Sequence, residues 1–219
     1  MKRASSLLLG LLVAGSVWAP ADLSAQMTLG LGGGVVSATF SGDDAEDFAD
    51  PDASKGSRVG LHVGAFLAIP IAERFSIVPG AAFIQKGVEY TLGDETASIE
   101  TSYIEIPVLV SAMLTGPESS PGFNLFAGPT FAFEAGCDIG LGSSSTSCDD
   151  AGIEDRETLD VGLMGGAGVS FPITETLSLM ISAGYELGLR TLDTSDDPAD
   201  IKNSAFFGSV HVGIPIGGQ

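Results

Sequence analysis

Two histidines are the side chains of this sequence best suited to proton transfer, because imidazole titrates near neutral pH. They are His62 and His211, and the sequence contains no other histidine. Hydrolysis or acyl transfer would require one of them to activate a nucleophile, with a third group orienting the ring. Both fall at alternate positions of apolar stretches, where a histidine more often packs through hydrogen bonds. We therefore predict no catalytic site, and a lipid-modifying enzyme is the less favoured alternative.

The two cysteines indicate a disulfide rather than a metal site. Cys137 and Cys148 lie in a stretch rich in glycine and serine. In an oxidising compartment outside the cytoplasm, an even pair of cysteines forms a bridge. Two thiolates with no histidine nearby in the sequence are an incomplete ligand set for zinc. We expect a loop disulfide, no metal and no cofactor.

Acidic residues dominate the charge. The chain has 9 Lys and Arg against 28 Asp and Glu, a formal net charge of −19, which leaves no basic patch for nucleic acid. Carboxylates are suitable ligands for calcium, but the densest acidic run does not have the spacing of a known calcium loop. A solvated loop is the favoured interpretation. That run contains Asp43, Asp44, Glu46, Asp47, Asp50 and Asp52.

Eight segments with apolar residues at every second position must position these side chains. Period two is typical of β-strands, whereas an amphipathic helix would repeat at three and four residues. The segments are long for strands of a soluble protein, but they suit tilted strands that cross a membrane. They are residues 27–40, 57–70, 74–92, 97–114, 122–136, 157–172, 176–192 and 203–216.

The connections between these segments alternate in character. Residues 70–73, 115–121 and 172–175 form short breaks, while longer or more acidic ones occur at 41–56, 93–95, 137–156 and 193–202. This alternation is typical of an up-and-down outer-membrane barrel, in which short turns lie on the periplasmic side and longer loops lie outside.

The two faces of each segment distinguish a membrane barrel from a soluble one. In residues 97–114, Ile104, Ile106 and Val108 share one face, and Tyr103 and Glu105 share the other. A soluble barrel is apolar inside, whereas a membrane barrel turns its aliphatic face to lipid and satisfies every backbone group by closing. The sequence predicts an all-β, eight-stranded antiparallel up-and-down transmembrane β-barrel. A soluble periplasmic lipocalin-like lipid-binding barrel is the alternative.

The first 25 residues have the layout of a secretory signal peptide. Lys2 and Arg3 precede a short apolar core at residues 7–17, and Ala25 offers a small residue at a cleavage site. That core is too short to cross a bilayer. We expect cleavage after residue 25 and a barrel domain over residues 26–219.

Short motifs follow one another along the predicted strands. They are Gly60–Gly64 (GLHVG), Phe75–Pro79 (FSIVP), Gln85–Gly87 (QKG), Tyr103–Pro107 (YIEIP), Ala127–Pro129 (AGP), Gly184–Leu189 (GYELGL) and Lys202–Asn203 (KN). In this order they resemble the porin-like outer-membrane β-barrel family of small single-domain barrels, over essentially the whole chain after the signal. The resemblance implies a Gram-negative outer membrane and assembly by the barrel-insertion machinery. It implies no single activity.

Ionisable residues on the inward faces are the remaining site candidates. Unpaired charge is costly in a narrow lumen, so we predict ion pairs between Lys86 and Glu105, and between Arg190 and Glu186 or Asp160. Side chains roughly fill an eight-stranded barrel, which favours a plug over a conduit. The predicted lumenal residues are Arg58, Lys86, Glu105, Glu134, Asp160, Glu186, Arg190, His62 and His211. We expect a monomeric barrel in outer-membrane lipid, with a structural, surface-interaction or minor porin-like permeability role.

Overall fold

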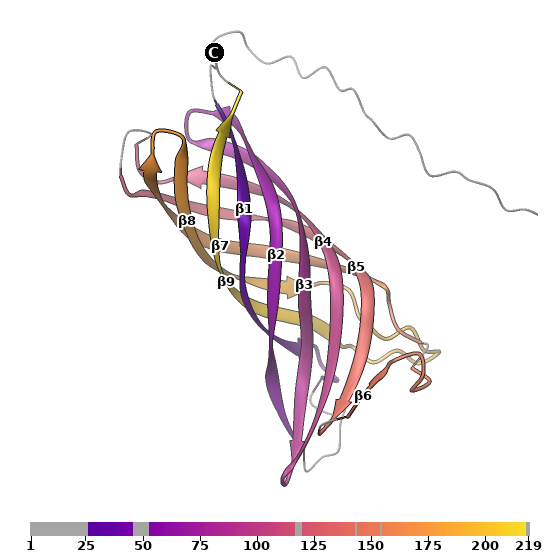
Figure 1. Ribbon diagram of the computed structural model, residues 1–219. Coiled ribbons are helices and arrows are strands. Elements are labelled where there is room, and N and C mark those ends of the chain that lie inside the picture. Colours follow the sequence, from indigo (N-terminus) through magenta and orange to yellow (C-terminus); the bar gives the residue numbers. More distant parts are fainter. Residues whose placement is uncertain (1–25, 46–52, 117–119, 143, 154, 218–219) are drawn as a thin grey trace, which may run out of the picture.

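The fold is a closed antiparallel barrel, seen in the computed structural model of the chain (Figure 1). The structure describes residues 26–45, 53–116, 120–142, 144–153 and 155–217. The predicted signal peptide, residues 1–25, lies outside these residues. Within them, no helix is long and apolar enough to cross a membrane.

Eight of the nine strands found in the described residues form the ring. In ring order these are β1 (Met27–Ser41), β2 (Ser54–Ala72), β3 (Phe75–Leu92), β4 (Glu95–Met113), β5 (Gly122–Leu141), β7 (Leu159–Thr174), β8 (Leu177–Gly188) and β9 (Lys202–Ile216). Each pairs antiparallel with its neighbours, and the pairing of β9 with β1 closes the ring. The predicted eight-stranded up-and-down barrel is confirmed. The short β6 (Ser144–Ser147) pairs only with β5, and the sequence did not predict it.

The ring strands follow the predicted segments closely, with differences at their ends. β5 continues to Leu141 instead of ending at residue 136, and β8 ends at Gly188 instead of residue 192. The register between β2 and β3 also shifts between Ser57 and His62. Such a bulge breaks the alternation of faces, so predicted orientations fail at these places.

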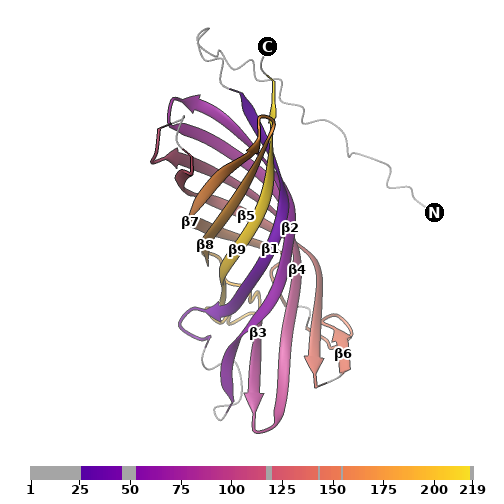
Figure 2. The ribbon, with the colours of Figure 1, turned by 60° about the vertical axis from the view of Figure 1, so that its left-hand side comes forward.

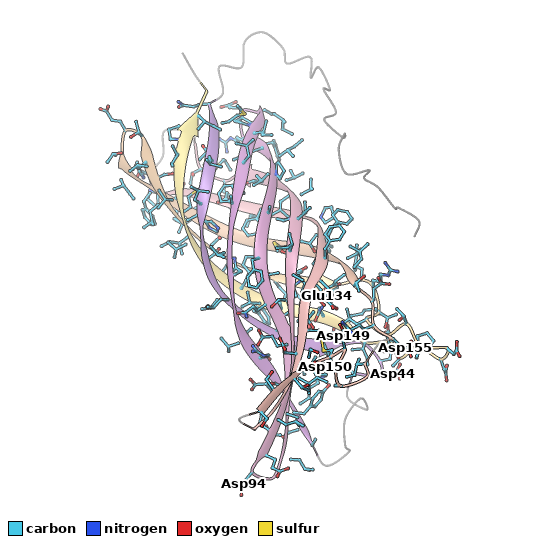
Figure 3. The ribbon with its side chains drawn as sticks, turned by 45° about the vertical axis from the view of Figure 1, so that its right-hand side comes forward. Asp44, Asp94, Glu134, Asp149, Asp150 and Asp155 are labelled. Atoms are coloured by element: carbon cyan, nitrogen blue, oxygen red, sulfur yellow. A yellow bond between two sulfur atoms is a disulfide. The ribbon has the colours of Figure 1, made fainter. Side chains whose placement is uncertain are left out.

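The two ends of the barrel differ as the connections predict. The two-residue turns after β2 and β7 lie at the end where β1 begins and β9 finishes (Figure 1). At the other end, β3 and β4 project beyond the rest of the barrel (Figure 2). Acidic side chains such as Asp44, Asp94 and Asp150 also lie there (Figure 3). Because short turns mark the periplasmic side of such barrels, we call these the periplasmic end and the outer end.

The outer wall of the barrel is aliphatic. On β2, Val59, Leu61 and Val63 are 67%, 61% and 60% exposed, and Ile104 and Ile106 on β4 also face outward. An exposed apolar surface of this extent is an association hazard in water, but it is the stable arrangement against lipid. A soluble lipocalin-like barrel requires the opposite arrangement, so the structure gives that alternative no support.

The outer half of the interior is packed. One apolar cluster contains Val36, Ala38, Ile84, Tyr103, Ala132 and Ala205. A second cluster lies among residues of the outer strand ends and loops, and contains Phe40, Ala45, Val88, Tyr90 and Ile201. Both clusters join residues far apart in the sequence, and together they form the core of the outer half.

Candidate functional site in the barrel lumen

A buried cluster of four charged side chains crosses the lumen. The Nζ atom of Lys86 on β3 lies 2.9 Å from Oε2 of Glu105 on β4 and 2.9 Å from Oε1 of Glu186 on β8. It lies 3.7 Å from Oδ2 of Asp160 on β7. The Lys86 side chain is only 1% exposed. These four residues are called the charge cluster below, and they include the Lys86–Glu105 pair that the sequence predicts.

Neutral side chains complete this cluster. The Thr130 hydroxyl donates a hydrogen bond of 2.7 Å to Glu186. The Asn203 amide donates to Asp160 at 2.8 Å and to the Tyr103 hydroxyl at 3.3 Å. The Lys86 ammonium also lies 5.6 Å from the centroid of the Tyr103 ring, within the range of a cation–π contact. The sequence did not predict these roles of Thr130, Asn203 and Tyr103, although Tyr103 shares the inward face of Glu105.

The charge cluster carries more negative than positive charge, since three carboxylates surround one ammonium. Oδ1 of Asp160 and Oε2 of Glu186 accept no hydrogen bond from the described residues. Oε2 of Glu105 contacts Lys86 at ion-pair distance but without hydrogen-bond geometry. The interior therefore has spare hydrogen-bond acceptors and a surplus of negative charge.

Glu134 lies at the outer rim rather than in the charge cluster. Arg156, from the loop after β6, places Nη2 2.9 Å from Oε1 of Glu134 and 2.7 Å from Oδ1 of Asp149 (Figure 3). Hydrogen bonds to Glu134, and then to Asp149, raise the pKa of the Arg156 guanidinium. This triad joins the loop to the end of the barrel wall.

Two predicted lumenal residues lie elsewhere. Arg58 pairs with Glu100. Thr101, next to Glu100, is buried inside, so Glu100 faces outward by the alternation of a strand. The bulge between Ser57 and His62 accounts for the wrong prediction that Arg58 faces the lumen. Arg190 follows the end of β8, is 47% exposed, and pairs with Glu157. Its predicted pairing with Glu186 or Asp160 is wrong because the strand stops before it.

Cys137 and Cys148 form a disulfide between β5 and the residue that follows β6. Among the described residues, no group of His, Cys, Asp or Glu has the arrangement of a metal site. Four members of the acidic run considered for calcium, Glu46, Asp47, Asp50 and Asp52, lie outside the described residues.

The periplasmic half of the lumen is hollow. A cavity of about 600 Å³ reaches from residues beside the short turns, such as Pro70 and Ser178, to Glu105 at the edge of the charge cluster. Side chains were expected to fill the interior, and that expectation is wrong for this half. Small inward residues, including Gly64 and Ala82, leave the space open. We call this space the periplasmic cavity.

Both histidines line the periplasmic cavity. Their strands, β2 and β9, flank β1, and the two ring centroids are 6.3 Å apart. His62 packs edge-on to Phe207, and His211 packs edge-on to Phe66. Among the described residues, neither histidine is hydrogen-bonded to a hydroxyl, a thiol or a carboxylate. The relay that a nucleophilic enzyme needs is not assembled around them.

The closed antiparallel ring and its apolar outer wall can be compared with known families. Residues 21–194 match the family described as outer membrane protein beta-barrel domain. The chain belongs to this family. Membership of the outer membrane protein beta-barrel domain family places the chain in the outer membrane, in agreement with the aliphatic wall.

The chain is also similar, at low sequence identity, to solved structures of outer-membrane proteins. OprG from Pseudomonas aeruginosa is 13% identical, with 86% of this chain and 95% of that chain covered and a TM-score of 0.47. Neisserial surface protein A is 12% identical, with 87% and 97% covered and a TM-score of 0.48. Ail of Yersinia pestis, in complex with the heparin analogue sucrose octasulfate, is 12% identical, with 86% and 99% covered and a TM-score of 0.42. No curated relative matches in sequence.

Proposed function

We propose that this chain is a non-catalytic outer-membrane barrel whose lumen is closed, and that it serves a structural or surface-interaction role. In this proposal a signal peptide at residues 1–25 is cleaved, the barrel-insertion machinery assembles the rest, and the barrel works as a monomer. The acidic loops at the outer end are the part available to partners outside the cell.

The observation that carries this proposal is the charge cluster. Its members and their hydrogen-bond partners come from β3, β4, β5, β7, β8 and β9, and all of them are buried. Side chains from most of the ring therefore meet across the lumen. A stable water path would require these contacts to separate and leave charges unpaired.

The lack of an assembled relay at His62 and His211 supports a role without catalysis. An enzyme would need a hydroxyl or thiol within reach of an imidazole. His62→Phe and His211→Phe variants should retain barrel assembly, and purified wild type should show no hydrolysis or acyl transfer on outer-membrane lipids. Turnover by wild type that either substitution abolishes would contradict this part of the proposal.

Ion flux through the purified full-length protein in planar bilayers tests the closed lumen. Wild type should give no sustained open channels. Lys86→Ala/Tyr103→Ala removes the ammonium and the ring that reach across the lumen from β3 and β4 and should raise the flux, whereas Arg190→Ala, outside the lumen, should match wild type. Sustained wild-type channels, or equal flux through all three proteins, would overturn the proposal in favour of a permeability role.

A further inference from the structure

The periplasmic cavity has the size and shape of a ligand site. Its volume of about 600 Å³ lies in the range of small-molecule pockets. It is open beside the short turns and ends blindly at the charge cluster, because Glu105 and Met164 lie at its inner end. A molecule of moderate size could therefore enter from the periplasmic side and stop at the charged layer.

Aromatic rings form much of the cavity wall. Phe66, Phe126 and Phe207 line it, and each ring rests against a glycine backbone. A Cβ atom added to Gly30 would lie 2.2 Å from Phe66, and one added to Gly184 would lie 2.7 Å from Phe207. Glycines therefore let the rings lie against the wall and leave the centre clear. Such a wall suits an apolar body, and its ring faces attract cations.

The closed end of the cavity presents hydrogen-bond acceptors that receive no hydrogen bond from the described residues. Nε2 of His62 is buried and has no hydrogen-bond partner among the described residues. In the neutral ring that carries its proton on Nδ1, Nε2 is an acceptor. Glu105 lines the same end, and its Oε2 lies at ion-pair distance from Lys86 but without hydrogen-bond geometry. A buried acceptor without a donor is unfavourable, and a ligand that supplies donors would relieve it.

Charge decides which kind of ligand fits. Three carboxylates around Lys86 leave the closed end negative, so an anionic head group would be repelled. A cationic head group would be attracted, and an ammonium has donors for both His62 and Glu105.

The geometry points to a binding site for small amphipathic amines in the periplasmic cavity, with the ammonium at His62 and Glu105 and the apolar body among the phenylalanines. The site does not depend on whether the lumen conducts. It gives the barrel a ligand-binding face toward the periplasm, separate from its outer loops.

Three molecules of one shape test the head-group chemistry: 4-phenylbutylamine, 4-phenylbutan-1-ol and 4-phenylbutyrate. Calorimetry with the full-length protein in nanodiscs should show one amine per barrel, and the carboxylate should bind at least about tenfold more weakly, the size expected from one charged hydrogen bond. Empty nanodiscs correct for partition into lipid. Carboxylate binding as tight as the amine, or no amine binding above empty nanodiscs, would overturn the assignment.

Two matched substitutions locate the binding. Ala82→Phe fills the cavity, because Ala82 lines it, whereas Ala127→Phe adds the same ring to the lipid-facing side of β5. Ala82→Phe should abolish amine binding, and Ala127→Phe should leave it unchanged. His62→Phe should weaken it about tenfold. Heat-modifiable gel mobility identifies the folded variants, and binding retained by folded Ala82→Phe would place the amine elsewhere and refute the site.

Discussion

The two halves of the lumen use the same ring of strands in opposite ways. In the outer half, Lys86 and its three carboxylates lie among packed apolar side chains, and the interior is full. In the periplasmic half, small residues and phenylalanines that rest on glycine leave about 600 Å³ open. The difference shows that barrel size alone does not decide whether a lumen is filled. The side chains at inward positions decide, separately at each level of the barrel, whether the lumen is filled.

Lys86 is the one cation of the charge cluster, and removing it should destabilise the outer half strongly. Lys86→Met leaves three buried carboxylates without their partner, and should lower the free energy of unfolding by about 3–5 kcal/mol. His211→Met in the periplasmic half should cost about 1 kcal/mol or less, because its neighbourhood is open. Urea unfolding in lipid vesicles measures both.

The matched control is Arg190→Met, at a half-exposed position beyond β8. It should differ from wild type by less than about 0.5 kcal/mol. If Lys86→Met were as mild as this control, the charge cluster would not be what holds the outer half together.

Removing the disulfide distinguishes the stability of the outer loop from the stability of the packed outer half. Cys137→Ser/Cys148→Ser should lower the local stability of the loop around β6 by about 3 kcal/mol, the loop-closure value for a short bridge. Global unfolding of the ring should lose no more than this amount, because the charge cluster lies below the loop and keeps its contacts. Hydrogen exchange resolved along the sequence compares the two losses. A loss of protection throughout β3 and β4 that exceeds about 3 kcal/mol would show that the loop holds the outer half closed.

Two alanines sharpen the contrast in packing. Ala132 is 1% exposed within the apolar cluster of the outer half, so Ala132→Leu should overpack it and cost about 1–3 kcal/mol. Ala82 lines the periplasmic cavity, so Ala82→Leu should be neutral or stabilising by up to about 1 kcal/mol through added apolar burial. Paired urea unfolding curves give the sign of each change. Equal destabilisation by both would mean that the two halves are packed alike.

The loop that follows β8 at the outer end should respond weakly to pH. Backbone N–H groups of Ser195 and Ala199 donate to Asp193 and lower the pKa of its carboxyl. Since the folded pKa is below the unfolded value, this stabilisation is present above about pH 4 and is lost as pH falls through the folded pKa. Hydrogen exchange of these two amides should accelerate below pH 4 relative to Asp193→Asn, which removes the titration. Parallel pH profiles in the two proteins would contradict the assignment.

The sequence predicted most of the fold because one physical rule governs it. Alternation of Ile104, Glu105 and Ile106 identifies a strand with one face in lipid, and the same rule brought Lys86 and Glu105 to the inside. The rule fails wherever the alternation is interrupted. A bulge moved Arg58 to the outer wall, and an early strand end left Arg190 outside.

Other features depend on distances that no single strand encodes. Asn203 reaches Asp160 across a sequence separation of 43 residues, and Lys86 reaches Glu186 across 100. The periplasmic cavity depends on which small residues share a level of the ring, and that depends on the register of all eight strands. The serine-rich β6 has no apolar alternation, so nothing in its sequence indicated a strand.

The most direct test of the account is which face of a strand touches lipid. The only tryptophan of the sequence, Trp18, lies in the predicted signal peptide, so a single tryptophan introduced into the processed barrel reports without background fluorescence from another. Val63 and Ile84 lie on adjacent strands near one level, 60% and 4% exposed. In vesicles of brominated lipid, Val63→Trp fluorescence should be strongly quenched and Ile84→Trp fluorescence largely retained. Equal quenching, or stronger quenching at Ile84→Trp, would contradict a barrel with its aliphatic rows in lipid and its charges inside.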